Sequence, residues 1–206
     1  MSLSTDALPV PGDSAGQADA RDRADMERLQ AGHDAALNDL MARHGPPVFR
    51  FLCRMVGNED DANDLAQDAF VRVFKSSKSF RLEQKFSSWL FTIAANLARN
   101  HFRWRARHPN ISLDAENPQT EQTLGSTLPA DSPAPSEEAL AIERTRAVRG
   151  AVNNLPEDLR EAIVLCEWEE CSVAEAALIL EATPKAVESR LYRARQVLRE
   201  RLKSWL

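Results

Sequence analysis

The sequence has no run of about 18 apolar residues, the length that a membrane-spanning helix requires, so we expect no membrane insertion of this chain. Its start lacks the basic and apolar regions of a secretory signal, and we expect a cytoplasmic protein. Seven glycines and eleven prolines are few for an all-β fold with many turns, and no segment alternates at period two. Helical periodicity recurs instead, so we predict an all-α protein.

Cysteine and histidine are also scarce. The three cysteines, Cys53, Cys166 and Cys171, lack the spacing of a metal knuckle, and no histidine pairs with them at ligand spacing. We therefore expect buried, reduced thiols, no metal and no cofactor. We also find no nucleophile–base pair and no phosphate-binding loop, so we do not expect an enzyme.

Positive charge is concentrated although the formal net charge of the chain is -5. Residues 81–107 contain six basic and one acidic residue, and residues 184–203 contain seven basic and two acidic residues. Residues 109–138 hold six acidic residues, several prolines and no Lys or Arg, which is typical of a flexible linker. Because a phosphate backbone responds to local patches, the distribution indicates two nucleic-acid-binding surfaces.

These boundaries predict four segments along the chain. They are a disordered N-terminal tail at residues 1–23, a helical domain at 24–107, an acidic flexible linker at 108–138 and a second helical domain at 139–206.

The second domain contains the pattern of a helix-turn-helix. Ser172 and Glu175 have the spacing of a capping box, and Thr183 and Pro184 suit the N-cap and first position of the next helix. Only residues 181–182 lie between the helices. The inward-facing stripes are Val173, Ala176, Ala177 and Leu180, then Val187, Leu191, Ala194 and Leu198. The alternative is a solvated basic helix on a helical hairpin.

The first domain pairs an acidic helix with a basic one. Residues 60–75 carry an apolar stripe opposite an acidic face. The acidic side chains either stabilise the start of the helix by interacting with its dipole or dock on a basic partner. Further along, Phe80 and Phe86 flank a polar loop, and a basic helix with interleaved aromatics follows. Basic and aromatic side chains of this kind suit the binding of unpaired bases. For Trp89 and Phe91, however, we favour a place in the core.

Together these segments resemble the extracytoplasmic-function (ECF) σ factors of the bacterial σ superfamily. "AGHDAALNDLMARHGPPVFRFL" is similar to the first σ2 helices, and "DDANDLAQDAFVRVF" and "KFSSWLFTIAANLARNHFR" are similar to the segments that follow them. "NNLPEDLREAIVL" with "SRLYRAR" resembles the σ4 domain. The resemblance covers both helical domains.

The resemblance implies a role for each polar set. Core RNA polymerase, through its β′ clamp and β subunits, would bind Asp61, Asp64, Leu65, Gln67 and Asp68. The −10 element would bind Lys78, Phe80, Lys85, Phe86, Asn96, Arg99, Asn100, Arg103 and Arg107. The −35 element would bind Thr183, Lys185, Glu188, Ser189, Arg190, Tyr192, Arg193 and Arg195. An anti-σ factor and a monomeric state off the polymerase are also implied.

Three residues depart from the family pattern. Asn100 stands where Asp is usual, Glu181 replaces a common turn glycine, and Glu188 occupies a position that is more often Arg or Lys. Glu181 implies that the turn forms without a residue for which positive φ is easy.

The leading interpretation is a σ subunit that confers promoter specificity on core polymerase. The alternative is a stand-alone helix-turn-helix repressor or activator, in which the first domain dimerises or senses a signal. A pure protein-interaction adaptor leaves both basic patches unexplained.

Glu188 generates a prediction about promoter sequence. A carboxylate repels phosphate but accepts a hydrogen bond from cytosine N4, so we predict a −35 preference with a cytosine near Glu188. Selection from a −35 library is expected to lose this preference in Glu188→Ala. Unchanged selectivity of that variant would contradict the prediction.

Overall fold

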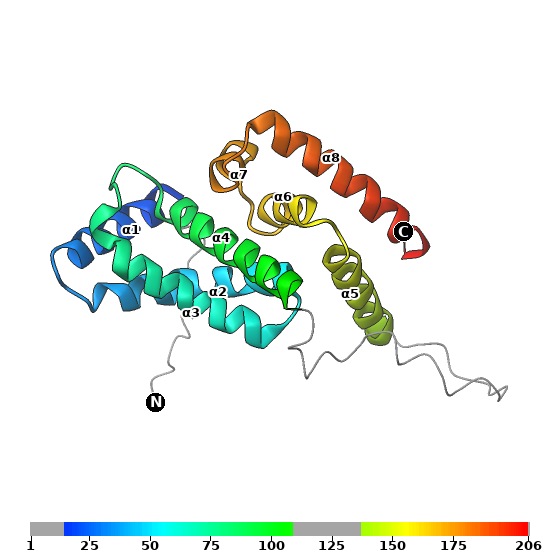
Figure 1. Ribbon diagram of the computed structural model, residues 1–206, viewed down its shortest axis with the longest axis horizontal. Coiled ribbons are helices and arrows are strands. Elements are labelled where there is room, and N and C mark those ends of the chain that lie inside the picture. The colour runs from blue at the N-terminus through cyan, green and yellow to red at the C-terminus, as the bar shows by residue number, and fades with distance from the viewer. Residues whose placement is uncertain (1–14, 109–136, 206) are drawn as a thin grey trace, which may run out of the picture.

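The computed structural model describes residues 15–108 and 137–205, which are helical apart from turns and short connections (Figure 1). This confirms the all-α prediction for the described residues. The helices are α1 (Ala15–Gln30), α2 (Ala36–Val56), α3 (Glu59–Ser76), η1 (Ser77–Ser79), α4 (Phe86–Arg107), α5 (Glu137–Asn153), α6 (Glu157–Glu167), α7 (Val173–Ile179), α8 (Pro184–Arg201) and η2 (Lys203–Trp205). The predicted linker at 108–138 lies outside the described residues except at its ends.

Helices α1 to α4 form an N-terminal bundle around the apolar face of α2. This face buries Leu40, Val48 and Phe51, and the Phe51 ring meets Phe91 of α4 edge-on at 5.4 Å between centroids. Helix α2 continues through Pro46 and Pro47, which cannot donate backbone hydrogen bonds. Apolar burial on both sides of the prolines therefore outweighs their helix-breaking tendency.

Helix α1 corrects one prediction. It begins at Ala15, so residues 15–23 are helical and not part of a disordered tail, whereas residues 1–14 lie outside the described residues. The reason is a buried ionic cluster: Asp22 accepts hydrogen bonds from Arg43 at 3.0 Å and contacts His44 at 2.8 Å, and Asp25 also pairs with Arg43. Composition alone did not show that these charges have partners on α2.

Helices α5 to α8 form a C-terminal unit centred on α6. Two predicted caps are confirmed: Ser172 and Glu175 make the reciprocal bonds of a capping box, and the Thr183 side chain accepts from the backbone N–H of Ala186. Val187, Leu191 and Ala194 are buried against the unit as the stripe predicted.

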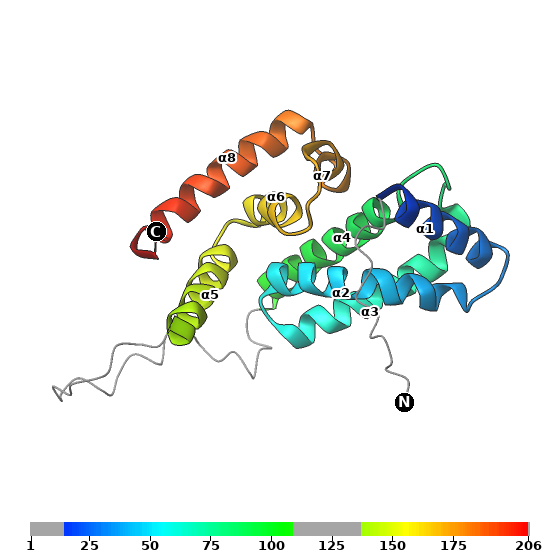
Figure 2. The same cartoon turned by 180° about the vertical axis from the view of Figure 1, so that it is seen from behind.

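The two units touch along α2 and α4. Helix α7 packs on α4, while α5 and α6 pack on α2, and the arrangement is visible from both sides of the molecule (Figures 1 and 2). Helix α6 consequently buries residues on every side from Leu159 to Leu165, including Arg160 and Glu161.

The ionic cluster of α1 makes acid stability testable. Burial alone raises the pKa of Asp22, but the contacts with His44 and Arg43 outweigh it and hold the pKa below the ordinary value of 3.8. This contribution to stability is present above pH 3.8 and is lost as pH falls through the lowered pKa. Asp22→Asn is expected to lower the free energy of unfolding by about 2 kcal/mol at neutral pH.

The measurement is urea denaturation at neutral pH and below the lowered pKa of Asp22, where the difference from wild type should shrink. Asp34→Asn, an exposed position, is the control and should change little. A pH-independent effect of Asp22→Asn would contradict this account.

Candidate nucleic-acid interface

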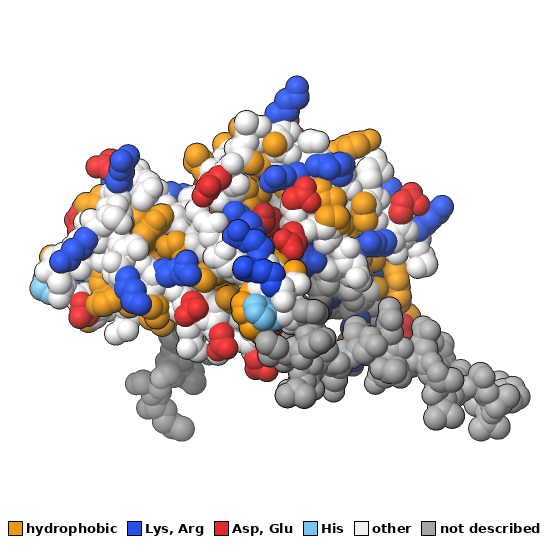
Figure 3. Space-filling model, in the orientation of Figure 1, with side chains coloured by type: hydrophobic (Ala, Val, Ile, Leu, Met, Phe, Trp, Pro, Cys, Tyr) orange, Lys and Arg blue, Asp and Glu red, His pale blue; other side chains and the backbone are white. Residues whose placement is uncertain are grey.

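The acidic face of α3 is exposed and largely unpaired. Asp64, Gln67 and Asp68 are exposed, and among the described residues neither aspartate has an ion-pair partner. Figure 3 shows acidic side chains gathered over α3, below the basic side chains of α4. Asp61 instead lies 3.4 Å from His101 and 3.7 Å from Arg105, and Leu65 is half-buried against the core. The face therefore leaves two free carboxylates for a basic partner.

The basic side chains of α4 are ordered by short polar residues one turn earlier. Arg99 Nη1 donates to Asn96 Oδ1 at 2.9 Å, and Arg103 Nη2 donates to Asn100 Oδ1 at 2.6 Å. Asn100 is neutral, so this contact fixes the orientation of the Arg103 side chain without neutralising its charge. Arg103 and Arg107 are exposed, and Arg107 Nε donates to the Arg103 carbonyl at 3.1 Å.

Two predicted base-contacting residues are core residues in the structure. Phe80 is 5% exposed and Phe86 is 2% exposed. Their rings meet at 6.0 Å, and Trp89 contacts both, at 4.8 Å from Phe80 and 6.2 Å from Phe86. The assignment of Phe80 and Phe86 to direct −10 contact is therefore wrong for this structure, because the cluster anchors the loop to the bundle. Burial of Phe91 agrees with the prediction for that residue.

Lysines flank this buried cluster at the surface. Lys78 is exposed at the end of α3, in the 3₁₀ turn. Lys85 precedes α4 and donates to Glu175 Oε1 of α7 at 2.9 Å. This bond raises the pKa of Lys85, and with the hydrogen bonds of the capping box it lowers the pKa of Glu175 to about 2.

The outward face of α8 carries two kinds of side chain: exposed ones with no ion pair among the described residues, and arginines that lie near carboxylates. Lys185, Glu188, Ser189 and Tyr192 are exposed, Tyr192 at 65%. The arginines lie near carboxylates of α6: Arg190 and Arg193 are 3.7 and 3.8 Å from Asp158, and Arg195 is 2.6 Å from Glu167. The N-terminal half of α8 is thus the part open to a ligand, as a recognition helix requires.

The turn between α7 and α8 contains a strained residue. Glu181 has φ +51°, a left-handed conformation that costs a residue with a Cβ roughly 1–2 kcal/mol. The turn therefore adopts the conformation that glycine usually provides, although glycine is absent.

Sequence reasoning missed the residues that join the two units. Arg99 Nε donates to Glu161 Oε1 at 2.7 Å, and Arg54 Nη1 donates to Glu169 Oε1 at 3.1 Å. Burial raises the pKa of Glu161, with Arg99 opposing the effect. In the sequence, Arg160 and Glu161 stand beside apolar residues, which only weakly indicates that they are buried between two units. The same pattern also occurs in a helix that has one solvated face.

The three cysteines are free and half-buried. Burial raises the pKa of each thiol, for Cys171 to about 12, so the protonated form prevails at neutral pH. Within residues 15–108 and 137–205 no group of Cys, His, Asp and Glu is arranged to hold a metal ion. None of the described helices is long and apolar enough to cross a membrane.

Comparisons with known proteins match both units. Residues 40–108 match the family described as Sigma-70 region 2, and residues 145–198 match Sigma-70, region 4. The ECF RNA polymerase sigma-E factor of Haemophilus influenzae is 36% identical over 88% of this chain and 95% of its own length. The ECF RNA polymerase sigma factor SigW of Bacillus subtilis is 32% identical over 86% of this chain and 95% of its own length.

Solved structures agree over both units. CnrH in complex with the cytosolic domain of CnrY has a TM-score of 0.66, 28% identity, and covers 89% of this chain and 98% of its own. The sigma factor RpoE in complex with the anti-sigma factor NepR from Bartonella quintana has a TM-score of 0.60, 25% identity, and covers 81% and 96%. This chain belongs to the σ70 family, as an ECF σ factor, and the stand-alone repressor is not favoured.

The strained turn gives a stability prediction. Glu181→Gly should raise the free energy of unfolding by about 0.5–1 kcal/mol, because relief of the left-handed strain exceeds the added entropy of the unfolded chain. Glu143→Gly, in the interior of α5, should instead lower it by about 1 kcal/mol. Chemical denaturation measures both, and destabilisation by Glu181→Gly would contradict the assigned strain.

Proposed function

We propose that this chain docks on the β′ clamp and β subunits of core RNA polymerase through the acidic face of α3 and confers promoter specificity on it. The observation that carries the proposal is the pair of exposed carboxylates, Asp64 and Asp68, which have no partner within the described residues. Two unpaired carboxylates one turn apart on one helix face suit a basic partner surface and give orientation to the complex.

Promoter DNA contacts the two basic helices in this proposal. Lys185, Glu188, Ser189 and Tyr192 of α8 read the −35 element in the major groove, and Arg190, Arg193 and Arg195 exchange their carboxylate partners for phosphates. Asn96, Arg99, Asn100, Arg103 and Arg107 of α4, together with Lys78 and Lys85, hold the unpaired −10 strand. The buried Phe80 and Phe86 support this surface from beneath.

When it is not bound to the polymerase, the chain is a monomer in the cytoplasm. It catalyses no reaction itself, and the polymerase carries out phosphodiester synthesis. An anti-σ factor controls it, in line with the anti-sigma complex of the RpoE relative.

Run-off transcription with purified core polymerase on a genomic promoter pool tests the function. Added chain should produce new start sites that core polymerase alone does not produce. Binding of the isolated chain as a dimer to a palindrome, with no added initiation, would instead support a stand-alone regulator and overturn the proposal.

The docking face has its own test. Asp64→Lys with Asp68→Lys should abolish binding to core polymerase, because two attractive charges become repulsive, while the helical circular dichroism spectrum and melting temperature stay unchanged. Glu27→Lys with Asp34→Lys, at exposed positions outside α3, makes the same charge change as a control. Core binding by the Asp64/Asp68 variant equal to that of the control would contradict the assigned face.

A further inference from the structure

A cavity of about 360 Å³ lies between α2 and α5, at the edge of the apolar core that both units share. Its lining follows helical spacing on both sides, with residues 50, 53, 54 and 57 from α2 and residues 145, 148, 149 and 152 from α5. Residues three and four positions apart lie on one helix face, so each helix presents one mixed face of arginine and apolar side chains to the cavity. None of the residues assigned above to polymerase or to promoter DNA lines it.

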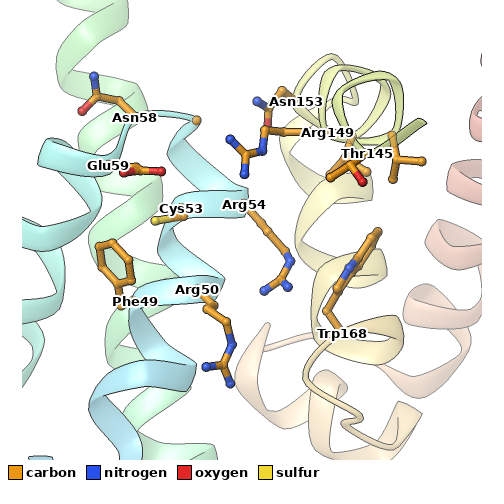
Figure 4. A pocket seen from close by; sticks show the side chains of 13 residues that line it. Phe49, Arg50, Cys53, Arg54, Asn58, Glu59, Thr145, Arg149, Asn153 and Trp168 are labelled. Carbon is orange, nitrogen blue, oxygen red and sulfur yellow. The ribbon is translucent and has the colours of Figure 1, made fainter. Parts of the chain in front are cut away.

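The inner part of the cavity is apolar. Val152 is 3% exposed, and Cys53 and Trp168 are half-buried and packed against the core. Trp168 stands on the wall opposite α2 (Figure 4). At the rim, Thr145 and Val148 are exposed, so the cavity is open to solvent. Its volume lies within the range of roughly 300–1,000 Å³ that is usual for small-molecule sites.

Three arginines surround this apolar interior. Arg54 Nη1 donates to Glu169 Oε1 at 3.1 Å, and its guanidinium lies 5.6 Å from the centroid of the Trp168 ring. Arg50 and Arg149 are exposed and have no hydrogen-bond or ion-pair partner among the described residues. Figure 4 shows Arg54 and Arg149 extending from α2 and α5 into the space between the helices. Two guanidinium groups are therefore available to a ligand, beside a third that is already oriented.

The electrostatics of the cavity favour an anion. Glu59 is the one carboxylate among the described lining residues, against three arginines. Burial raises the pKa of the Cys53 thiol and Glu59 adds to the rise, while the charges of Arg149 and Arg54 oppose it. The positive charges thus act on the inner wall as well as on the rim, and an excess of positive charge in a cleft with apolar walls attracts an anion.

We infer that this cavity binds a small organic anion, a molecule with one carboxylate or phosphate group on an apolar body. The guanidinium groups hold the anionic group, because their planar donors match two oxygens of a carboxylate or phosphate. The apolar body packs against Trp168, Cys53 and Val152. The bound molecule contacts α2 of one unit together with α5 and Trp168 of the other. This inference is independent of the proposed function, since the site shares no residue with the polymerase and promoter surfaces.

Isothermal titration calorimetry on the full chain tests both halves of the ligand. Octanoate and octyl phosphate are the probes, and octanol and inorganic phosphate each supply one half alone. At least one of the two organic anions should bind at least about tenfold more tightly than octanol or inorganic phosphate, because each of these lacks half of the contacts. The stronger of the two identifies the preferred anionic group. Equal binding of octanol, equal binding of inorganic phosphate, or no binding of either organic anion would overturn the inference.

Removal of the two available guanidinium groups tests the residues. Arg50→Gln with Arg149→Gln should weaken binding of the preferred organic anion by about tenfold and leave the melting temperature unchanged, since both side chains are exposed and unpaired among the described residues. Arg72→Gln with Arg146→Gln, at exposed positions outside the lining, removes the same charge and should bind as the wild type does. Equal affinity of the two double variants would contradict the site.

The thiol of Cys53 reports where the ligand lies. The preferred organic anion at ten times its Kd should slow alkylation of Cys53 by the neutral reagent iodoacetamide about tenfold. Alkylation of Cys166, which is outside the lining, should be unchanged in the same molecules, as mass spectrometry of the peptides measures. Unprotected Cys53, or equal protection of both thiols, would place the ligand elsewhere and overturn the inference.

A substitution at the rim gives a further test. Val148→Asp puts a carboxylate at an exposed lining position, so it should weaken binding of the organic anion by about tenfold, whereas Val148→Asn, of nearly the same shape, should not. Equal binding by these two variants would count against an anion in the cavity. Because none of these measurements uses polymerase or DNA, failure of the site leaves the σ function untouched, and absence of run-off transcription leaves the site untouched.

Discussion

Helix α6 packs on both halves of the molecule at once, and the positions of Arg160 and Glu161 within it constrain the rest. A buried charge is tolerated only with a partner, so Arg160 requires the end of α2 and Glu161 requires Arg99 of α4. The helix also packs on α8, which it links to the N-terminal bundle. The same helix therefore supports α8 and determines where α4 lies relative to it.

The distribution of acid explains how a chain with a net charge of -5 can carry two basic surfaces. Carboxylates of α6 and α7 pair with cations of α4 and α8, whereas Asp64 and Asp68 of α3 stay free. The paired carboxylates offset part of the positive charge of the basic helices. The unpaired carboxylates of α3 are the face that we propose as the docking surface.

Local rules predicted much of the fold and less of the site. Capping at Ser172 and Thr183 and the stripe of α8 follow from neighbouring residues, so the sequence was sufficient for the helix-turn-helix. The start of α1, the burial of Phe80 and the partners of Glu161 depend on segments distant in sequence. Periodicity identifies the apolar face of a helix, but it does not reveal that a polar face is covered by another unit.

We propose docking of the acidic face of α3 on core RNA polymerase, and the rest of the function depends on it. The most direct measurement is hydrogen–deuterium exchange of the backbone amides of α3 in the full chain, with and without core polymerase. Residues 61–68 are expected to become protected when core polymerase binds, because the exposed face around Asp64 and Asp68 is then covered. Unchanged exchange of these residues in the complex would contradict the account.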